Sequence, residues 1–365
     1  MYSEILNKIF NLQKLSFDEL KQIPEFEVCV GSPENQLFHD ETTDEHIELM
    51  INHLFNRIDT PNDNWIVLYL CVIFHDFRKP QTISTDENGI YHNIDHDLQS
   101  SIYIWDFVYK AKKEGFNLTL DRFKLINRAS KIIRWHMIYH VDRLGENTLK
   151  RFISTFSIDE LCLLIEFQKL DHVSSKKERE EVYFDGKLEE MIQRRYQIFN
   201  YMPERNDIYF QILFGAPGSG KSLYTSKIDK SNTVILSPDE LRKELLNDER
   251  DRKNHVMIFG ELQQRAKKIL SFEKKNVVLD ATSTVFDLRQ NFVKIAHQRQ
   301  IPLIFTVFLT PLEICLKNNS IRKRNVDPDG IKEVYERAEM PCGVETERVE
   351  YMVDNNLYLD YLKIY

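Results

Sequence analysis

The chain has 365 residues, of which 42% are hydrophobic and 29% charged, with 11 Gly and 11 Pro. This composition is that of a folded protein and excludes the disordered and fibrous classes. Because the length exceeds what one hydrophobic core usually organises, we predict two domains. The formal net charge of −8 argues against a protein that coats duplex nucleic acid, but it allows an enzyme that grips one strand end.

The beginning of the chain has no uninterrupted apolar stretch of the kind found in signal peptides. The longest apolar run, Trp65 to Phe74, is about half of the ~20 residues that a transmembrane helix needs, so we predict a buried helix there. The five cysteines are widely scattered and form no CxxC pair. We therefore expect a cytoplasmic protein with reduced thiols and no membrane segment.

The first part of the chain has the apolar periodicity of helices. One helical face is formed by Ile47, Met50, Ile51, Leu54 and Phe55. Thr42 and Glu45 have the spacing of a capping box at the start of this helix. The run from Trp65 to Phe74 is apolar on all sides, which predicts a central helix. We expect further helices over residues 97–113, 120–139 and 158–172.

A run rich in Lys, Glu and Arg over residues 176–206 has too few apolar positions for a core. We predict a solvated connecting helix and linker there. Beyond it, short β-rich runs over 208–214, 233–236, 276–279 and 303–309 alternate with helical stretches, which predicts a parallel sheet covered by helices. The expected organisation is an all-α domain over 1–175, a linker over 176–206 and an α/β domain over 207–365.

Residues 215–222 read Gly-Ala-Pro-Gly-Ser-Gly-Lys-Ser, follow an apolar strand and open a helix. This is the GxxxxGK[ST] phosphate-binding loop in the context that it requires. Its backbone N–H groups are expected to surround phosphate oxygens, while the lysine neutralises the β and γ phosphates of ATP and the last serine ligates Mg²⁺. The expected nucleotide-binding residues are Gly215, Gly218, Ser219, Gly220, Lys221 and Ser222. The loop alone does not distinguish a kinase from an ATPase or a GTPase.

Five further charged positions follow the loop. Asp239 and Arg242 share one helix face. Asp239 therefore suits the role of the base that accepts a proton, and Arg242 the role of a cation that orients the hydroxyl to be phosphorylated. Asp239 can alternatively be a helix cap. Asp280 ends a buried strand and is either a partner of the Mg²⁺ shell or a substrate contact. Arg322 and Arg324 are expected in a lid over the migrating phosphoryl group.

Histidines are concentrated before residue 175, where nine of the eleven occur. A single histidine can be an ordinary core or surface residue. A joint pattern of imidazole and carboxylate groups on several helices is instead typical of a di-metal phosphohydrolase. The candidate ligands are His46, His75, Asp76, His96, His136 and Asp171. In such a site Asp76 bridges two cations that activate a water, and Lys79 steadies a phosphate.

These motifs resemble two families. The histidine and aspartate series resembles the HD superfamily, in the branch related to the HD domains of tRNA nucleotidyltransferases, and the presence of both His96 and His136 favours two metals. The loop, Asp-Glu-Leu-Arg242, Asp280-Ala-Thr and Arg322-Lys-Arg324 resemble the polynucleotide 5′-kinase module. Here Ser283 stands where some relatives carry Asn, and Phe and Arg follow Asp76 in place of the commoner Ile-Gly.

Taken together, the chain resembles the bifunctional HD-domain polynucleotide kinases. The kinase resemblance implies that Asp239 is the general base, that Arg242 holds the acceptor-end phosphate, that Asp280 contacts the acceptor, and that Arg322 or Arg324 contacts the transferring phosphate. The whole-chain resemblance implies removal of 2′,3′-cyclic, 2′- or 3′-phosphates with transition metals such as Mn, Co or Ni. It also implies ATP-dependent phosphorylation of 5′-OH ends of RNA or DNA, with a separate ligase that joins the healed ends. Two alternatives stay open: a nucleoside or metabolite kinase fused to a nucleotide phosphohydrolase, and a nucleotide-gated sensor.

Overall fold

The computed structural model describes residues 1–138, 144–177, 203–204, 207–248, 253–322 and 325–362. The chain divides into two compact units, Met1–Arg195 and Tyr196–Tyr365. Most of the predicted linker lies outside the described residues, as do Arg324 and the end of the helix expected over 120–139. The linker and its exact limits therefore stay predictions.

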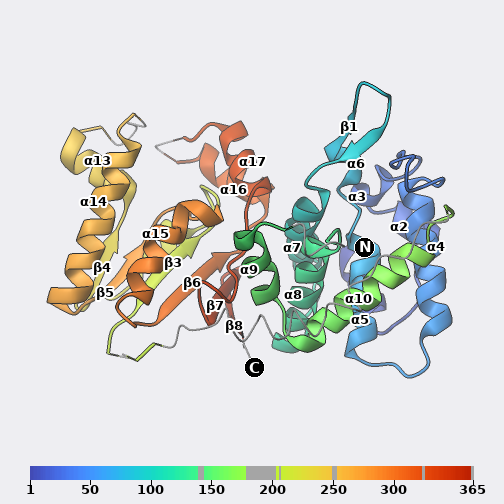
Figure 1. Cartoon of the computed structure of the whole chain (residues 1–365), viewed down its shortest axis with the longest axis horizontal. Helices are drawn as coiled ribbons and strands as arrows, with labels where there is room; N and C mark the ends of the chain where they lie inside the picture. Colours follow the sequence, from blue (N-terminus) through green and yellow to red (C-terminus); the bar gives the residue numbers. More distant parts are fainter. Residues whose placement is uncertain (139–143, 178–202, 205–206, 249–252, 323–324, 363–365) are drawn as a thin grey trace. The chain divides into compact units, whose positions relative to one another are not determined.

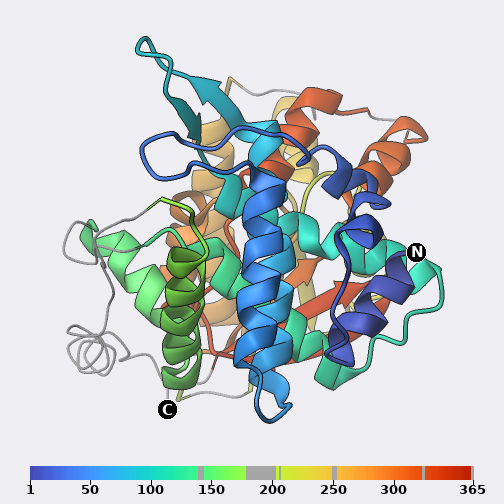
Figure 2. The same ribbon diagram turned by 90° about the vertical axis from the view of Figure 1, so that its right-hand side faces the viewer.

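The N-terminal unit is a helical bundle with one small hairpin (Figures 1 and 2). Its elements are α1 (Tyr2–Phe10), α2 (Phe17–Lys21), α3 (Pro24–Glu27), α4 (Thr43–Arg57), α5 (Asp63–Phe74), α6 (Lys79–Thr82), β1 (Ile83–Thr85), β2 (Tyr91–Asn93), α7 (His96–Lys113), α8 (Leu120–Trp135), α9 (Glu146–Thr155) and α10 (Ile158–Val173). In the described part of the chain, no helix combines the length and apolar content that a bilayer crossing requires.

Helix α5 is the centre of the bundle, as its apolar sequence predicts. Every residue from Val67 to Phe74 is buried, and the helix contacts α4, α7, α8 and α10. The Asn62 side chain accepts hydrogen bonds from the N–H groups of Asn64 and Trp65 and so fixes where α5 begins. The rigid end of this helix therefore carries the His75-Asp76 pair into the core.

The expectation of an all-α unit is incomplete. The antiparallel strands β1 and β2 form a hairpin that projects from the bundle (Figure 1), and its turn contains Gly89 at φ +78°. The three-residue strands are only partly buried, so they leave no clear alternation of apolar and polar residues. Helix α8 also ends at Trp135, four residues earlier than predicted, with His136 as its C-cap.

The C-terminal unit is an α/β domain. Its elements are β3 (Phe210–Phe214), α12 (Lys221–Thr225), β4 (Thr233–Leu236), α13 (Pro238–Leu246), α14 (His255–Lys268), a π-helical turn η2 (Ile269–Glu273), β5 (Asn276–Leu279), α15 (Phe286–His297), β6 (Leu303–Phe308), α16 (Leu312–Ser320), α17 (Pro328–Glu336), β7 (Arg348–Val353) and β8 (Asn356–Tyr361). The sheet has the order β4-β5-β3-β6-β7-β8. All neighbouring strands are parallel except β7 and β8.

Helices cover both faces of this sheet. The side chains of β3 show this, because successive residues of the strand contact different helices. Leu213 belongs to a core cluster that includes Tyr224 of α12, and the Gln211 amide donates to the Tyr224 hydroxyl at 2.8 Å. Phe210 instead contacts the ring of Phe292 on α15. Because successive strand residues point to opposite faces, α12 and α15 lie on opposite sides. The predicted parallel sheet with covering helices is therefore confirmed.

The hairpin of β7 and β8 was not predicted. Its turn contains Asp354 and Asn355, which have φ values of +47° and +66°. Two consecutive left-handed residues are typical of the tight turns that join antiparallel strands, and Asp and Asn tolerate that conformation. The Asp-Asn pair between two β-rich runs was therefore the signal that could have identified this hairpin.

Candidate metal centre and nucleotide site

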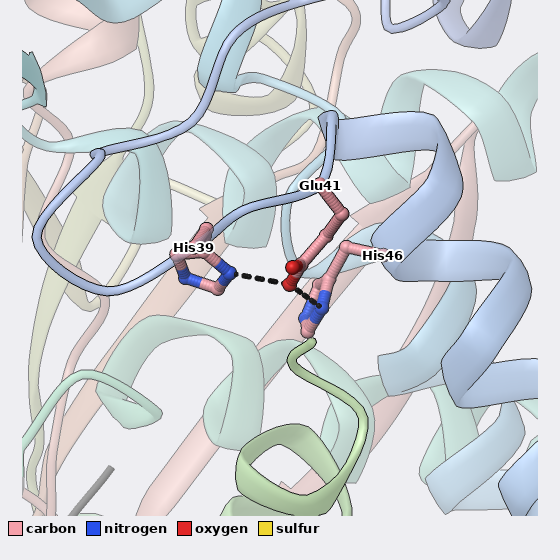
Figure 3. Close-up of side chains that lie close together, drawn as sticks. All are labelled: His39, Glu41 and His46. Atoms are coloured by element: carbon pink, nitrogen blue, oxygen red, sulfur yellow. Dashed lines mark hydrogen bonds and ion pairs between the residues drawn. The ribbon is translucent and has the colours of Figure 1, made fainter. Parts of the chain in front are cut away.

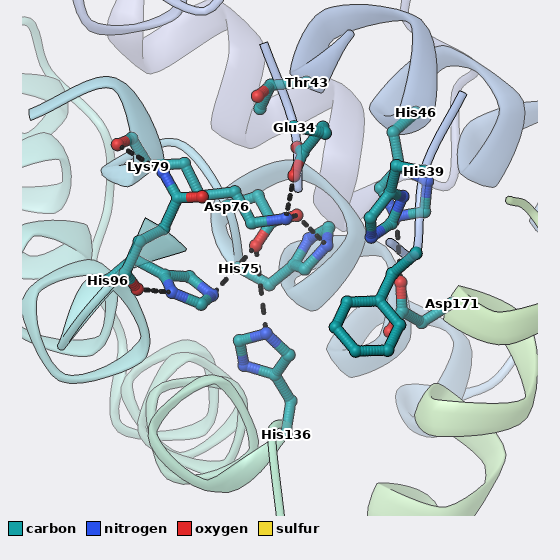
Figure 4. A network of polar contacts seen from close by, with 12 residues as sticks. Glu34, His39, Thr43, His46, His75, Asp76, Lys79, His96, His136 and Asp171 are labelled. Atoms are coloured by element: carbon teal, nitrogen blue, oxygen red, sulfur yellow. Dashed lines mark hydrogen bonds and ion pairs between the residues drawn. The ribbon is translucent and has the colours of Figure 1, made fainter. Parts of the chain in front are cut away.

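Asp76 is the middle of a buried cluster of basic side chains (Figure 4). Its Oδ1 lies 3.3 Å from His96 Nε2 and 3.8 Å from His136 Nε2. Its Oδ2 lies 3.0 Å from His75 Nε2 and 2.7 Å from Lys79 Nζ. These groups come from the ends of α5, α7 and α8 and from the start of α6. Helices far apart in sequence thus meet at one carboxylate.

A second group of donors adjoins the first. His46, in the first turns of α4, places its Nε2 2.8 Å from Oδ1 of Asp171 near the end of α10. The ligand atoms of His46, His75 and Asp171 all lie within 4.8 Å of one another, and the same holds for Asp76, His96 and His136. The six residues predicted from the sequence therefore form two adjacent triads.

Several candidate metal-ligand atoms in these triads are buried without a hydrogen bond. Within the described residues, this applies to His75 Nε2, His96 Nε2 and Asp76 Oδ1. Both imidazole nitrogens lie within ion-pair distance of the Asp76 carboxylate, but a buried polar atom that lacks a hydrogen bond costs free energy. A cation in each triad would satisfy these atoms, and imidazole with carboxylate is a ligand set that suits transition metals. The residues present therefore fit a pair of metal ions.

The orientation of three of these imidazoles is set locally. The Nδ1 atoms of His75, His96 and His136 each lie within hydrogen-bond distance of the backbone carbonyl three residues earlier, at 3.2, 2.6 and 2.7 Å. A proton on Nδ1 leaves the lone pair of Nε2 free for a metal. Each ring therefore presents Nε2 to the centre of the cluster.

The charges of the cluster shift its pKa values strongly. Burial lowers the pKa of His136 to about 4, and the electrostatic interactions with the neighbouring His75 and His96 act in the same direction. For His46 burial also acts downward, but the interactions with the carboxylates of Asp171 and Glu41 outweigh it and raise the pKa to about 9. The cluster thus stabilises positive charge at His46 and disfavours it at His136.

Three residues of this region were not predicted from the sequence: Glu34, His39 and Glu41. Lys79 Nζ lies 2.7 Å from both Glu34 Oε2 and Asp76 Oδ2, and the two carboxylates raise its pKa against the effect of burial. Glu41 contacts His39 and His46. These residues lie in the loop before α4, where no periodic pattern marks which side chains turn inward.

The phosphate-binding loop of the C-terminal unit follows β3 and closes on itself. Lys221 is buried, and its Nζ donates to the carbonyl oxygens of Gly215 and Ala216 at 2.6 and 2.9 Å. Burial lowers the pKa of Lys221 to about 8, although the negative charge of Asp280 opposes the shift. The backbone carbonyl groups of the loop therefore hold the lysine side chain in place.

Helix α16 and the residues before it support this loop. Thr310 Oγ1 donates to the carbonyl of Ser219 at 2.9 Å, and Asn318 Nδ2 donates to that of Gly218 at the same distance. Gly218 has φ +86°, and a Cβ there would lie 2.3 Å from the carbonyl oxygen of Cys315. Only glycine fits this contact without displacing α16.

Asp239 and Arg242 lie together at the start of α13. The N-cap of this helix is Ser237 and the helix begins at Pro238, so Asp239 is in the first turn and is not the cap residue. Arg242 is buried and its Nη1 donates to Asp239 Oδ1 at 2.9 Å. Asp239 is about half-exposed, which leaves its carboxylate accessible to a substrate.

Asp280 follows the end of β5, next to the loop. Burial raises its pKa, and the charge of Lys221 opposes this shift. The charges of Asp239 and Arg322 act on both Asp280 and Lys221. These four predicted residues therefore lie within electrostatic reach of one another at the carboxyl edge of the sheet, while Arg324 lies outside the described residues.

A buried ion pair holds the segment that follows Asp280. Arg289 on α15 donates to both carboxylate oxygens of Glu345, at 2.7 and 2.8 Å, and to the backbone carbonyls of Ser283 and Thr284, both at 3.2 Å. Ser283 has φ +49°. This pair joins residues 56 positions apart and was not predicted, because sequence spacing does not reveal such long-range pairing.

Comparison with known families agrees with this geometry for the C-terminal unit. The family model described as AAA domain matches residues 211–341, which include the loop, Asp239, Arg242, Asp280 and Arg322. The parallel sheet, the loop after β3 and this match define a P-loop domain with a kinase-type fold. The N-terminal unit is a helical domain with two potential metal-binding triads.

Solved structures give a weaker likeness. The structure described as the Pnkp1/Rnl/Hen1 RNA repair complex is 21% identical over 38% of this chain and 45% of that chain, with a TM-score of 0.32. A second structure of a Pnkp1/Rnl/Hen1 complex is 24% identical over 35% and 42%, with a TM-score of 0.28. The chain thus spans less than half the length of these proteins. No curated protein matches the chain.

Proposed function

We propose that this chain is a bifunctional enzyme that heals nucleic-acid ends. The C-terminal unit phosphorylates 5′-OH ends with ATP and Mg²⁺, and the N-terminal unit removes 2′,3′-cyclic, 2′- or 3′-phosphates. The observation that carries the proposal is the gathering of Lys221, Asp239 and Asp280 at one edge of a parallel sheet, where such sheets bind ligands. The preference for a polynucleotide rests on the motif resemblance described above.

In the kinase reaction, the half-exposed Asp239 accepts the proton of the 5′-hydroxyl as its oxygen attacks the γ-phosphorus of ATP. Arg242 Nη1 donates to the Asp239 carboxylate at 2.9 Å, and in this proposal Arg242 also holds the phosphate at the acceptor end. Lys221 and Arg322, with Arg324, neutralise charge on the transferring group. Asp280 either supports the Mg²⁺ shell with Ser222 or contacts the acceptor. The products are ADP and a 5′-phosphate.

In the phosphoesterase reaction, His46, His75 and Asp171 would hold one cation and Asp76, His96 and His136 would hold the other, with Mn, Co or Ni as the candidate metals. Such cations polarise a phosphate ester and lower the pKa of a bound water. Lys79 already lies at Asp76, and it neutralises the phosphate that enters the site. The buried walls of the bundle exclude bulk water from these charges.

The two activities are complementary, because together they leave a 3′-OH and a 5′-phosphate. A ligase consumes these ends, so we propose a separate ligase as the functional partner. The ends come from RNA or DNA that was cleaved to a cyclic phosphate or 3′-phosphate and a 5′-OH, and the proposed setting is the cytoplasm.

One assay tests both halves. An RNA oligomer with a 5′-OH and a 2′,3′-cyclic phosphate is incubated with Mn²⁺, with Mg²⁺ and ATP, or with both. We expect 3′ dephosphorylation to need only Mn²⁺ and 5′ phosphorylation to need ATP. A labelled ATP competition between this oligomer and free nucleosides is the second arm. Preference for the nucleoside would favour the metabolite-kinase alternative, and absence of both reactions would favour the sensor.

A further inference from the structure

His46 differs from the other three histidines of the metal cluster. Its Nδ1 does not reach a backbone carbonyl and makes no hydrogen bond of normal geometry within the described residues. Its nearest acidic partner is Glu41, whose Oε1 lies 3.4 Å from this nitrogen (Figure 3). His46 belongs to the first turns of α4, so the residue three positions earlier is Thr43, where the helix begins. The Nδ1 atom of His46 faces the Glu41 carboxylate instead of a backbone carbonyl.

Glu41 is itself held from several sides. Its Oε1 lies 2.8 Å from His39 Nδ1, and its Oε2 accepts from the backbone N–H groups of Asp40 at 3.1 Å and Lys176 at 3.0 Å. The Glu41 side chain is completely buried. Lys176 lies three residues after the end of α10, the helix that carries Asp171. Glu41 therefore connects the two segments that supply His46 and Asp171.

We propose that Glu41 is a positioning residue for one of the two cation sites. Its carboxylate accepts a hydrogen bond from the Nδ1–H group of His46, which keeps the proton on Nδ1, leaves Nε2 directed to Asp171 as the metal-binding atom and makes this imidazole a stronger ligand. The cation held by His46, His75 and Asp171 is then bound more tightly than the one held by Asp76, His96 and His136. This inference rests on the proposed phosphoesterase function.

His39, Glu41 and His46 also have the composition of a separate metal site. The geometry favours the positioning role, because both histidine nitrogens face the same carboxylate oxygen and one of them is at the distance of an ordinary hydrogen bond. A third cation would need to separate these atoms. The two roles predict different numbers of bound ions, so a binding experiment distinguishes them.

The test compares Glu41→Gln with Glu45→Gln in the full chain. Glu45 is a matched control, since it lies in the same segment and contacts Lys176 Nζ at 2.8 Å but no metal-binding side chain. Gln at this position also preserves the capping interaction with the Thr42 N–H. Binding of Mn²⁺ is measured by titration with detection of free Mn²⁺ by electron paramagnetic resonance.

We expect the unmodified chain and Glu45→Gln to bind two ions with unequal affinity. In Glu41→Gln the tighter site should weaken about 10-fold to 100-fold while the weaker site is unchanged. Unchanged binding in Glu41→Gln would overturn the inference. Three ions in the unmodified chain and two in Glu41→Gln would overturn it in favour of a separate site. Absence of Mn²⁺ binding to the unmodified chain would remove the proposed phosphoesterase as well.

A second variant covers the case in which Glu41→Gln does not fold, which thermal unfolding would reveal. His39→Gln releases one side of Glu41 and leaves its contact with His46 in place. We expect a smaller loss of affinity at the same site. A nitrogen NMR spectrum of the histidine rings should then show less Nδ1-protonated His46 in Glu41→Gln than in the unmodified chain, and an unchanged tautomer would contradict the assignment.

Discussion

Lys221 shows how burial prepares a single side chain for its ligand. Its ammonium group is enclosed by the carbonyls of its own loop, and its pKa is lowered to about 8, mainly because burial disfavours the charged form. The phosphates of a nucleotide would favour the charged form. Binding therefore shifts the pKa of this lysine back upward.

The first prediction is that Mg²⁺-ATP binding near pH 8 takes up protons. Lys221 is only partly protonated there in the free protein, because its pKa is about 8, and the bound phosphates raise that pKa, so the sign is uptake. Calorimetry in buffers of different ionisation enthalpy measures the proton number. At pH 6.5 Lys221 is already charged, and its contribution to uptake should vanish. Proton release at pH 8 would contradict this account.

The second prediction concerns the proton acceptor Asp239. Asp239→Asn removes the proton acceptor but keeps the size of the side chain, so we expect phosphorylation of a 5′-OH oligomer to fall about 100-fold to 10,000-fold. Nucleotide binding should be retained. Steady-state kinetics with labelled ATP measures both effects. The control is Glu240→Gln, an exposed neighbour, and equal losses in both variants would show that Asp239 has no special role.

At the scale of elements, helix ends build the candidate metal cluster. His75 and His136 are the C-caps of α5 and α8, His96 begins α7, and Asp171 lies in the last turn of α10. Helix ends are suited to this task because their side chains can turn toward a common point while the helix bodies pack around it. The lengths of these helices therefore decide where the ligands meet.

The contact between the phosphate-binding loop and α16 gives the third prediction. Gly218→Ala adds a Cβ 2.3 Å from a backbone oxygen of Cys315 at a φ of +86°. We expect the C-terminal unit to lose about 2–4 kcal/mol of stability and to bind ATP weakly, because neither backbone can yield without strain. Gly260→Ala is the control, since its Cβ meets open space within α14. Thermal unfolding with and without ATP measures both variants, and equal unfolding temperatures would contradict the prediction.

At the scale of the whole molecule, each unit has its own core and its own site. The fourth prediction is that the two activities are lost separately. Lys221→Ala should lower kinase activity by roughly 100-fold or more, since it removes a charge from the phosphate site, and it should leave the phosphoesterase unchanged. His75→Ala should do the reverse.

Assays of both activities on the same preparations check this separation. Circular dichroism of each variant checks that it is folded. Simultaneous loss of both activities in a folded variant would show that the two units do not act independently.

The amino-acid sequence by itself predicted the local elements and several candidate site residues. Apolar periodicity predicted the central helix α5, and the alternation of β-rich and helical runs predicted the parallel sheet. The glycine loop, Asp239, Arg242 and Asp280 were identified because their spacing relative to strands follows from short-range geometry. The hairpin of β1 and β2 was missed because its three-residue strands leave little periodic signal, and the hairpin of β7 and β8 was missed because its only local signal is the Asp-Asn turn.

Tertiary structure alone decided how distant groups pair. It brought His46 beside Asp171, 125 residues away, placed Lys79 between Glu34 and Asp76, and joined Arg289 to Glu345. It also placed Glu41 behind His46. Such contacts depend on how whole helices pack, and burial then makes charge pairing obligatory, because an isolated buried charge is too costly to keep. No local pattern in the chain records which partner a buried charge will meet.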